Sequence, residues 1–181
     1  MIQLALPKNK KARVWFDPGE LDLRLGGERV ERVVPCRTTT VQRDGFAAVE
    51  FFSPAGHHQY ALLGARFSAS DTSELRVRVV NGAVAGNVPG SIAALVELLH
   101  VGLLPEYVYA VLDVAATEGA AGRLGCGDLD FEMAAHGDIG SSLLAFKSVT
   151  CMVLRLLLVN ESERQDEAVI AQIIEDGPRV W

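Results

Sequence analysis

The stretch SSLLAFKSVTCMVLRLLLV, residues Ser141–Val159, decides the fold. From Leu143 onward it is apolar on nearly all sides of a helical projection, interrupted only by Lys147 and Arg155, as is typical of a buried helix. The apolar run is shorter than the about twenty residues that a membrane-spanning helix needs. Ser141 and Ser142 stand directly before it and predict a helix N-cap, because serine hydroxyls accept hydrogen bonds from the first free backbone amides.

The chain before residue 82 predicts short strands separated by turns that contain proline, glycine or aspartate. Glu74–Val80 shows the pattern most clearly, because Leu75, Val77 and Val79 alternate with two arginines and so predict a half-buried strand. The strands that we expect in this part are Ala12–Phe16, Leu21–Leu25, Glu28–Val34, Gly45–Phe52, Tyr60–Ser68 and Glu74–Val80.

The chain after residue 82 predicts mainly helices. Apolar spacing predicts a helix over Ser91–Val101, and Pro105 with Gly119 frames another over Glu106–Glu118. DLDFEMA, residues 128–134, alternates and predicts a strand, whereas residues 167–175 fit either a helix or a strand. The order of these elements predicts an α+β fold, a two-layer sandwich in which helices cover one face of a mostly antiparallel sheet.

Composition limits the class of protein. A chain of 181 residues predicts a single domain, and 49% apolar residues exclude global disorder. The net charge is −6. Residues 1–90 carry 12 Lys and Arg against 9 Asp and Glu, and residues 91–181 carry 5 against 14. An acidic chain of this kind is a poor candidate for binding duplex DNA, where neutralising phosphates dominates the affinity. The basic stretch Lys8–Arg13 is typical of a solvated arm.

The three cysteines, Cys36, Cys126 and Cys151, lie far apart in the sequence and form no CxxC or Cys/His spacing. We therefore expect neither a disulfide framework nor a structural zinc site, and Cys151 within the apolar helix reads as a core residue. The N-terminal residues do not have the layout of a cleavable signal. These features predict a cytoplasmic protein without a membrane anchor.

Three stretches, in order, resemble the fourth domain of elongation factor G, the translocase of the ribosome. SSLLAFK (Ser141–Lys147) resembles the family's Asp-Ser-Ser-Glu, one free position, then Ala-Phe-Lys, although Gly140 and Leu143 replace the acidic residues. LLPEYVYAVLD (Leu103–Asp113) is similar to Pro-Lys-Glu-Tyr-Ile-Pro-Ala-Val, with one residue fewer after the proline. HQYALLGARF (His58–Phe67) is similar to Arg-Gly-Gln-Tyr-Gly followed by a strand, with only Gln59 and Tyr60 retained.

The resemblance implies a fold and a role. It implies a split β-α-β core over residues 45–160 with a left-handed crossover, and it leaves residues 1–44 as an N-terminal β extension without a counterpart. There is no GxxxxGK[ST] loop to bind a nucleotide phosphate, so the chain lacks a GTPase domain. The implied role is non-catalytic, translation-associated binding to the ribosome, to RNA or to a translation partner, without a cofactor. A homo-oligomer that has lost the family role is the alternative among structural proteins.

In the family, two tip loops carry the contacts, and here they would be SPAGHHQ (53–59) and HGDIGSS (136–142). We expect these loops to meet, with His57 or His58 close to Gly137–Gly140 and with the loop histidines more exposed than His100. The side chains that would make the contacts are His57, His58, Gln59, Tyr60, His136, Asp138, Ser141, Ser142 and Lys147.

Other interpretations of these residues stay open. His57, His58, His136 and Asp138 could instead form a metal or acid–base site, because imidazoles titrate near neutral pH and bind zinc, or the histidines could simply be exposed. Ser141 and Ser142 lack a GxSxG elbow, which favours the N-cap over a nucleophile. Lys147 suits either phosphate contact or a snorkelling side chain. Asp128, Asp130 and Glu132 are spaced for the solvent face of a strand.

Overall fold

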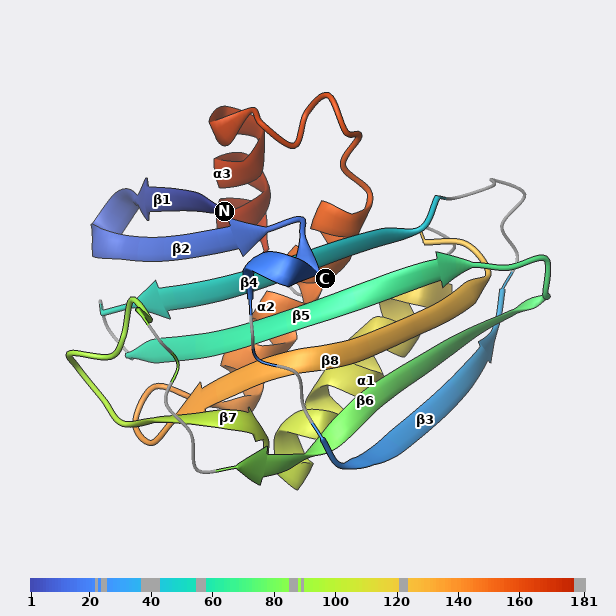
Figure 1. Ribbon diagram of the computed structural model, residues 1–181, viewed down its shortest axis with the longest axis horizontal. Helices are drawn as coiled ribbons and strands as arrows, with labels where there is room; N and C mark the ends of the chain where they lie inside the picture. The colour runs from blue at the N-terminus through green and yellow to red at the C-terminus, as the bar shows by residue number, and fades with distance from the viewer. Residues whose placement is uncertain are drawn as a thin grey trace.

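The computed structural model describes residues 1–21, 23, 26–36, 43–54, 58–84, 88, 90–120 and 124–177. Over these residues the chain forms strands and helices in the order shown in Figure 1. The strands are β1 (Ile2–Leu6), β2 (Lys10–Trp15), β3 (Glu28–Pro35), β4 (Gly45–Ser53), β5 (Gln59–Ala69), β6 (Glu74–Val84), β7 (Leu99–Leu103) and β8 (Gly127–Gly137). The helices are α1 (Pro105–Ala120), α2 (Leu143–Leu157) and α3 (Glu167–Asp176), with short 3-10 turns η1 (Pro7–Asn9) and η2 (Pro18–Glu20).

All eight strands join one sheet in the order β1-β2-β4-β5-β8-β7-β6-β3. Neighbouring strands in this order are antiparallel. The short β7 separates β8 from β6 at one end only, and over the rest of their length β6 and β8 pair directly and in parallel. The N-terminal strands therefore lie at both edges of the sheet, with β1 and β2 on one side and β3 on the other.

Two helices cover one face of the sheet (Figure 1). α2 packs on β4 and β5, and α1 packs on β6 and β3. Ten of the fifteen residues of α2 are buried, so the prediction of a buried helix is confirmed. The α+β class, the mostly antiparallel sheet and the position of these helices on one face are confirmed as well. α3 lies beside the β1 edge of the sheet and packs against α2 and β1.

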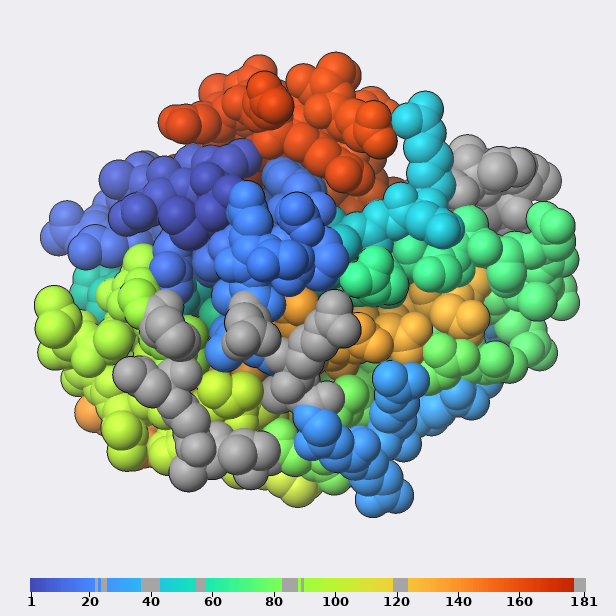
Figure 2. Space-filling model, viewed as in Figure 1, coloured from blue at the N-terminus to red at the C-terminus, as the bar shows by residue number. Residues whose placement is uncertain are grey.

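The other face of the sheet is partly covered by irregular chain, which the sequence did not predict. Residues of η2 and of the segment before β7 cross this face in Figure 2. Beneath them lies a second apolar cluster, which contains Trp15, Leu21, Leu23, Phe46, Phe52, Tyr60, Leu62, Val88, Ala93, Leu99 and Met133. Leu21 and Leu23 are buried here without being part of a strand, so the strand expected over Leu21–Leu25 is not formed at these two residues.

The rest of that face is charged. Arg78 of β6 donates to Asp128 at 2.7 Å and to Asp130 at 3.0 Å on β8, and to Glu31 at 3.1 Å on β3. Burial alone would lower the pKa of the Arg78 guanidinium, but hydrogen bonds to Asp130 and Glu31 outweigh it and raise that pKa. The carboxylates of β8 thus point outward as expected, and they are ion-paired as well as solvated.

The structure differs from the sequence prediction at two elements, and it decides a third that the sequence left ambiguous. The helix expected over Ser91–Val101 is wrong: residues 92–96 form turns, and Leu99–Leu103 is the strand β7. The local helical preference of this segment is outweighed by its pairing with β8, in which His100 lies opposite His136 and Val101 opposite Ala135. The strand β1 was not predicted, and residues 167–175 lie in a helix. No helix in the described part of the chain is long and apolar enough to cross a membrane.

Cys36 and Cys126 form a disulfide, so the expectation that no disulfide is present is wrong. The two cysteines are 90 residues apart in sequence, and their Cα atoms are 5.5 Å apart. The sheet brings them together, because Pro35 at the end of β3 and Gly127 at the start of β8 pair with consecutive residues of β6. The spacing of the cysteines along the sequence gives no indication that the fold brings two of them together. Cys151 is free and buried in α2.

Candidate functional site

The two predicted loops meet at one end of the sheet, where β4 ends and β5 begins beside the end of β8. The Tyr60 amide donates to the carbonyl of Gly140 at 2.9 Å, and the Ser141 hydroxyl donates to the carbonyl of Tyr60 at 2.8 Å. His58 lies so close to Gly140 that a Cβ on that glycine would collide with its imidazole. The prediction that the loops meet is confirmed for His58, while His57 lies outside the described residues. We call this end of the molecule, residues 58–60, 95–100 and 136–144, the tip.

Glu97 organises the tip, and sequence reasoning missed it. Its carboxylate is fully buried. One oxygen accepts from the amides of Ile139 and Gly140, each at 2.9 Å, and the other lies 2.7 Å from His58 Nε2. A Cβ at Gly137 or Gly140 would collide with this carboxylate, which explains the glycines of the loop. Three hydrogen bonds to one buried anion hold the two loops and the segment before β7 together.

The histidines are arranged differently from the prediction. His136 lies in β8, not in a loop, and it is buried, with Nδ1 2.9 Å from the carbonyl of Gly102. Its ring stacks on His100, whose Nε2 lies 2.7 Å from a carboxylate oxygen of Asp138. The side chain of His58 is 21% exposed and that of His100 is 28% exposed. The expectation that the loop histidines are more exposed than His100 is therefore wrong for His58 and His136. His136 is buried because β8 runs on to Gly137.

The serines at the start of α2 have structural partners. The Ser142 hydroxyl accepts from the Ala145 amide at 3.1 Å, as expected of an N-cap. The Ser141 hydroxyl accepts from the Gly137 amide at 2.8 Å while it donates to Tyr60. The Tyr107 hydroxyl donates to the Ser141 carbonyl at 3.3 Å. These hydrogen bonds fasten α1, α2 and the tip loops to one another.

The remaining residues that the sequence predicted at the tip make contacts away from its surface. Gln59 pairs with Ser53 in the β4–β5 ladder, and Lys147 is half-buried one turn into α2. Tyr60 is buried, and its hydroxyl donates to Glu50 at 3.1 Å, away from the tip surface. Burial and then the charge of Glu50 raise the pKa of the Tyr60 hydroxyl far above its usual value, so this tyrosine stays neutral.

The imidazoles and carboxylates of the tip do not converge on one point. His58 is engaged by Glu97, Asp138 by His100, and His136 by a backbone carbonyl. Over the described residues, no group of three histidine, cysteine or acidic side chains is placed to hold a metal ion. The described members of the alternative His57/His58/His136/Asp138 cluster are thus divided among separate partners.

The outer surface of the tip is apolar. Large side chains that the fold leaves exposed gather along the segment before β7, the loop after β8 and the first turn of α2: Leu95, Val96, Leu98, Ile139, Leu143 and Leu144. The Asp138 amide donates to the Leu98 carbonyl at 3.1 Å, so the first two segments are in direct contact. We call these six side chains the apolar tip surface. Residues 91–104 and 137–146 contain no lysine or arginine.

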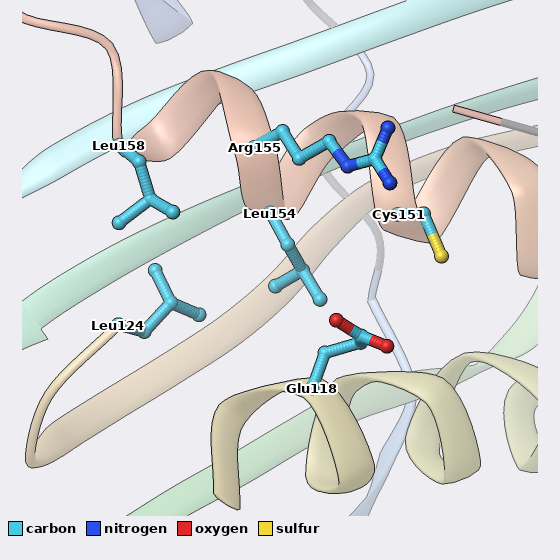
Figure 3. Close-up of a pocket in the computed structure, with 6 residues that line it drawn as sticks. All are labelled: Glu118, Leu124, Cys151, Leu154, Arg155 and Leu158. Carbon is cyan, nitrogen blue, oxygen red and sulfur yellow. The ribbon is translucent and has the colours of Figure 1, made fainter. Parts of the chain in front are cut away.

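A small hollow lies between α1 and α2, away from the tip (Figure 3). It is lined by Glu118, Leu124, Cys151, Leu154, Arg155 and Leu158, and its cavity volume of about 10 Å³ has room for one water at most. Figure 3 shows the Glu118 carboxylate reaching from α1 toward the side of α2 that carries Cys151 and Arg155. Burial and then Glu118 raise the pKa of the Cys151 thiol. A thiol kept protonated is a poor nucleophile, so this hollow offers no catalytic centre.

A larger, open hollow of about 490 Å³ lies between the N-terminal hairpin and the connection from α2 to α3. It is lined by apolar side chains, which include Val14 and Phe16, and by four acidic side chains: Asp17, Glu20, Glu161 and Glu167. The Arg164 guanidinium lies over the Phe16 ring at 5.1 Å to the ring centroid. This arrangement brings no acid–base pair or nucleophile together, so the tip stays the better candidate site.

Comparisons with family models, with curated proteins and with solved structures found no match to this chain.

Proposed function

We propose that this chain is a non-catalytic binding module related to the fourth domain of elongation factor G, and that it contacts a translation-associated protein through the apolar tip surface. The observation that carries the proposal is the combination of exposed apolar side chains with loops held by a buried carboxylate. Contiguous exposed apolar surface marks interaction sites in soluble proteins. Loops already ordered before binding lose less entropy when a partner docks.

The chain path of the core supports the relationship. β6 and β8 are parallel, and the chain between them passes through α1 on the helical face. When Figure 1 is turned so that β6 and β8 point upward, β8 lies to the right of β6 and α1 lies behind them. That arrangement corresponds to a left-handed crossover, which is rare among parallel connections. It supports the split β-α-β topology that the sequence motifs imply for residues 45–160.

The chemistry of the tip favours a protein partner over RNA. Lysine and arginine supply most of the affinity of phosphate contacts, and the two segments that form the tip surface contain neither residue. Where the family motif has acidic residues, this chain has Gly140 and Leu143, and Leu143 is 49% exposed. A surface that carries an exposed leucine in place of a charged residue suits an apolar patch on another protein.

Co-sedimentation with purified ribosomes of the source organism tests this function. We expect the wild-type chain to pellet with ribosomes and the double variant I139S/L143S to lose at least about tenfold in affinity, because two exposed anchors are removed. V33S is the matched control, since Val33 is 42% exposed but pairs with Arg76 near the start of β6, at the opposite end of the sheet. Binding carried by apolar contacts should persist at high salt, whereas phosphate contacts would weaken steeply.

Two outcomes contradict the proposal. One is a wild-type chain that stays in the supernatant at every ribosome concentration. The other is equal pelleting of I139S/L143S and the wild type. The cytoplasmic location that this role requires has its own test, because disulfides are rare where glutathione keeps thiols reduced. Chains isolated with their thiols blocked at lysis show whether the Cys36–Cys126 bond is present in the cell, and a fully formed bond there would argue against a role at cytoplasmic ribosomes.

A further inference from the structure

The strand β3 is an open edge of the sheet. It pairs with β6 on one side, and over the described residues no strand lies on its other side. Most of its residues are exposed, in contrast to β1 at the other edge, which packs against α3. An edge strand presents free amides and carbonyls and is a template for pairing with another chain.

The sequence of β3 is self-complementary in charge. It begins Glu28-Arg29-Val30-Glu31-Arg32, which has opposite charges at equal distances from Val30. In an antiparallel pair centred on Val30, each Glu28 lies opposite the Arg32 of the other copy, and each Arg29 lies opposite Glu31. Cross-strand pairs of opposite charge stabilise a sheet, and like charges directly opposite destabilise it.

Charge also excludes the neighbouring registers that keep the same faces aligned. Centring the pair on Arg29 or on Arg32 sets an arginine against its own copy, and centring it on Glu31 sets two carboxylates against each other. Edge charges usually prevent strands from pairing with other molecules. Here they disfavour the registers centred on Arg29, Glu31 and Arg32 and favour the one centred on Val30.

The side chains already alternate as this arrangement requires. Arg29 and Glu31 face the charged side of the sheet, where they pair with Glu132 and Arg78. Arg32 faces the helical side, where it donates to Asp113 of α1 at 2.6 Å. A two-fold axis perpendicular to the sheet through Val30 keeps each face aligned with its counterpart. Both copies of α1 then lie on the same side of one continuous sheet.

We propose that two copies of this chain pair through β3, antiparallel about a two-fold axis at Val30, so that their sheets join. The partner is a second copy because no other sequence is needed to satisfy the charge pattern. This interface uses none of the six residues of the apolar tip surface, so the dimer and the proposed function can be tested independently of each other.

Two charge reversals test the pairing in the full chain by sedimentation equilibrium. E28R sets two arginines opposite each other at both ends of the interface, and R32E sets two glutamates there. Each variant alone should weaken the dimer at least about tenfold. An equimolar mixture of E28R and R32E should restore it as a heterodimer, because the introduced arginine again meets a glutamate. E175R is the matched control, with the same change of charge on an exposed position of α3.

Recovery of the dimer in the mixture distinguishes a loss of strand pairing from damage to the fold, because two misfolded variants would not form a dimer on mixing. Thermal melts of R32E provide a second check, since that variant also loses its contact with Asp113. A wild-type chain that stays monomeric up to about 1 mM overturns the proposal. So does a dimer that E28R leaves intact, or a mixture that stays monomeric.

Discussion

Arg13 on β2 and Glu50 on β4 stand directly opposite each other and form a largely buried ion pair. Arg13 Nε donates to Glu50 Oε2 at 2.6 Å, the Glu50 side chain is fully buried, and the Arg13 side chain is 10% exposed. The second carboxylate oxygen accepts from the hydroxyls of Tyr60 and Ser91. Every polar atom of this buried carboxylate therefore has a partner.

Removing the cation of this pair should be costly. R13M leaves a buried carboxylate without its counter-charge, and we expect a loss of about 3–5 kcal/mol in the free energy of unfolding. R13M/E50Q should recover part of that loss, because the neutral amide still accepts from Tyr60 and Ser91. Urea denaturation of the three chains measures both effects. A loss below about 1 kcal/mol in R13M would mean that the pair is open to water.

Alkaline pH should destabilise the protein through Tyr60. Burial and then Glu50 raise the pKa of this hydroxyl in the folded state, so only the unfolded chain releases its proton near the ordinary tyrosine pKa of about 10. Stability from the neutral hydroxyl is therefore fully present below about pH 10 and is lost as pH rises above it. Melting temperatures between pH 8 and 11 should fall more steeply for the wild type than for Y60F. Parallel curves would contradict this linkage.

The helix α2 should depend on Phe146, which is fully buried and stacks on Tyr107 with ring centroids 4.6 Å apart. F146A should lose about 3–5 kcal/mol, as for other buried aromatic side chains that leave a cavity. L144A, two residues earlier in the same helix, removes an exposed side chain and should stay within about 0.5 kcal/mol of the wild type. Thermal melts of F146A close to the wild type would show that α2 is not packed as described.

Local patterns predicted the elements that local forces decide. The serine cap and apolar run of α2, and the alternation of β6 and β8, follow from hydrogen bonding and periodicity within each segment. The helix prediction over residues 91–101 is wrong because Leu99, His100 and Val101 pair with β8, which lies far along the chain, and no local pattern shows such pairing. Glu97 went unnoticed for the same reason: its partners, His58, Ile139 and Gly140, are about forty residues away on either side.

The disulfide should stabilise the protein measurably. Cys36 and Cys126 close a loop of 90 residues, and the loss of chain entropy in the unfolded state predicts about 4–5 kcal/mol. Reductant should lower the midpoint of urea unfolding of the wild type by the corresponding amount. C36S/C126S should unfold at that lower midpoint whether reductant is present or not. A wild-type midpoint that reductant does not change would contradict the bond.

Glu97 should control the order of the tip without touching a partner. E97A leaves the amides of Ile139 and Gly140 without an acceptor, and each hydrogen bond to a charged group contributes about 1.5–3 kcal/mol. Hydrogen exchange at these two amides should therefore accelerate by about tenfold or more. The amide of Leu63, at the centre of β5, should keep its protection as an internal reference.

E97Q separates the charge of Glu97 from its shape. The amide oxygen of the introduced glutamine can still accept from one loop amide, but hydrogen bonds to a neutral group are about half as strong as those to a carboxylate. Exchange at Ile139 and Gly140 should fall between the wild type and E97A. If binding needs preordered loops, affinity in the ribosome assay should follow the same order, although Glu97 is buried. Unchanged hydrogen exchange at these amides in E97A would mean that other contacts order the tip and that the Glu97 carboxylate does not stabilise the loops.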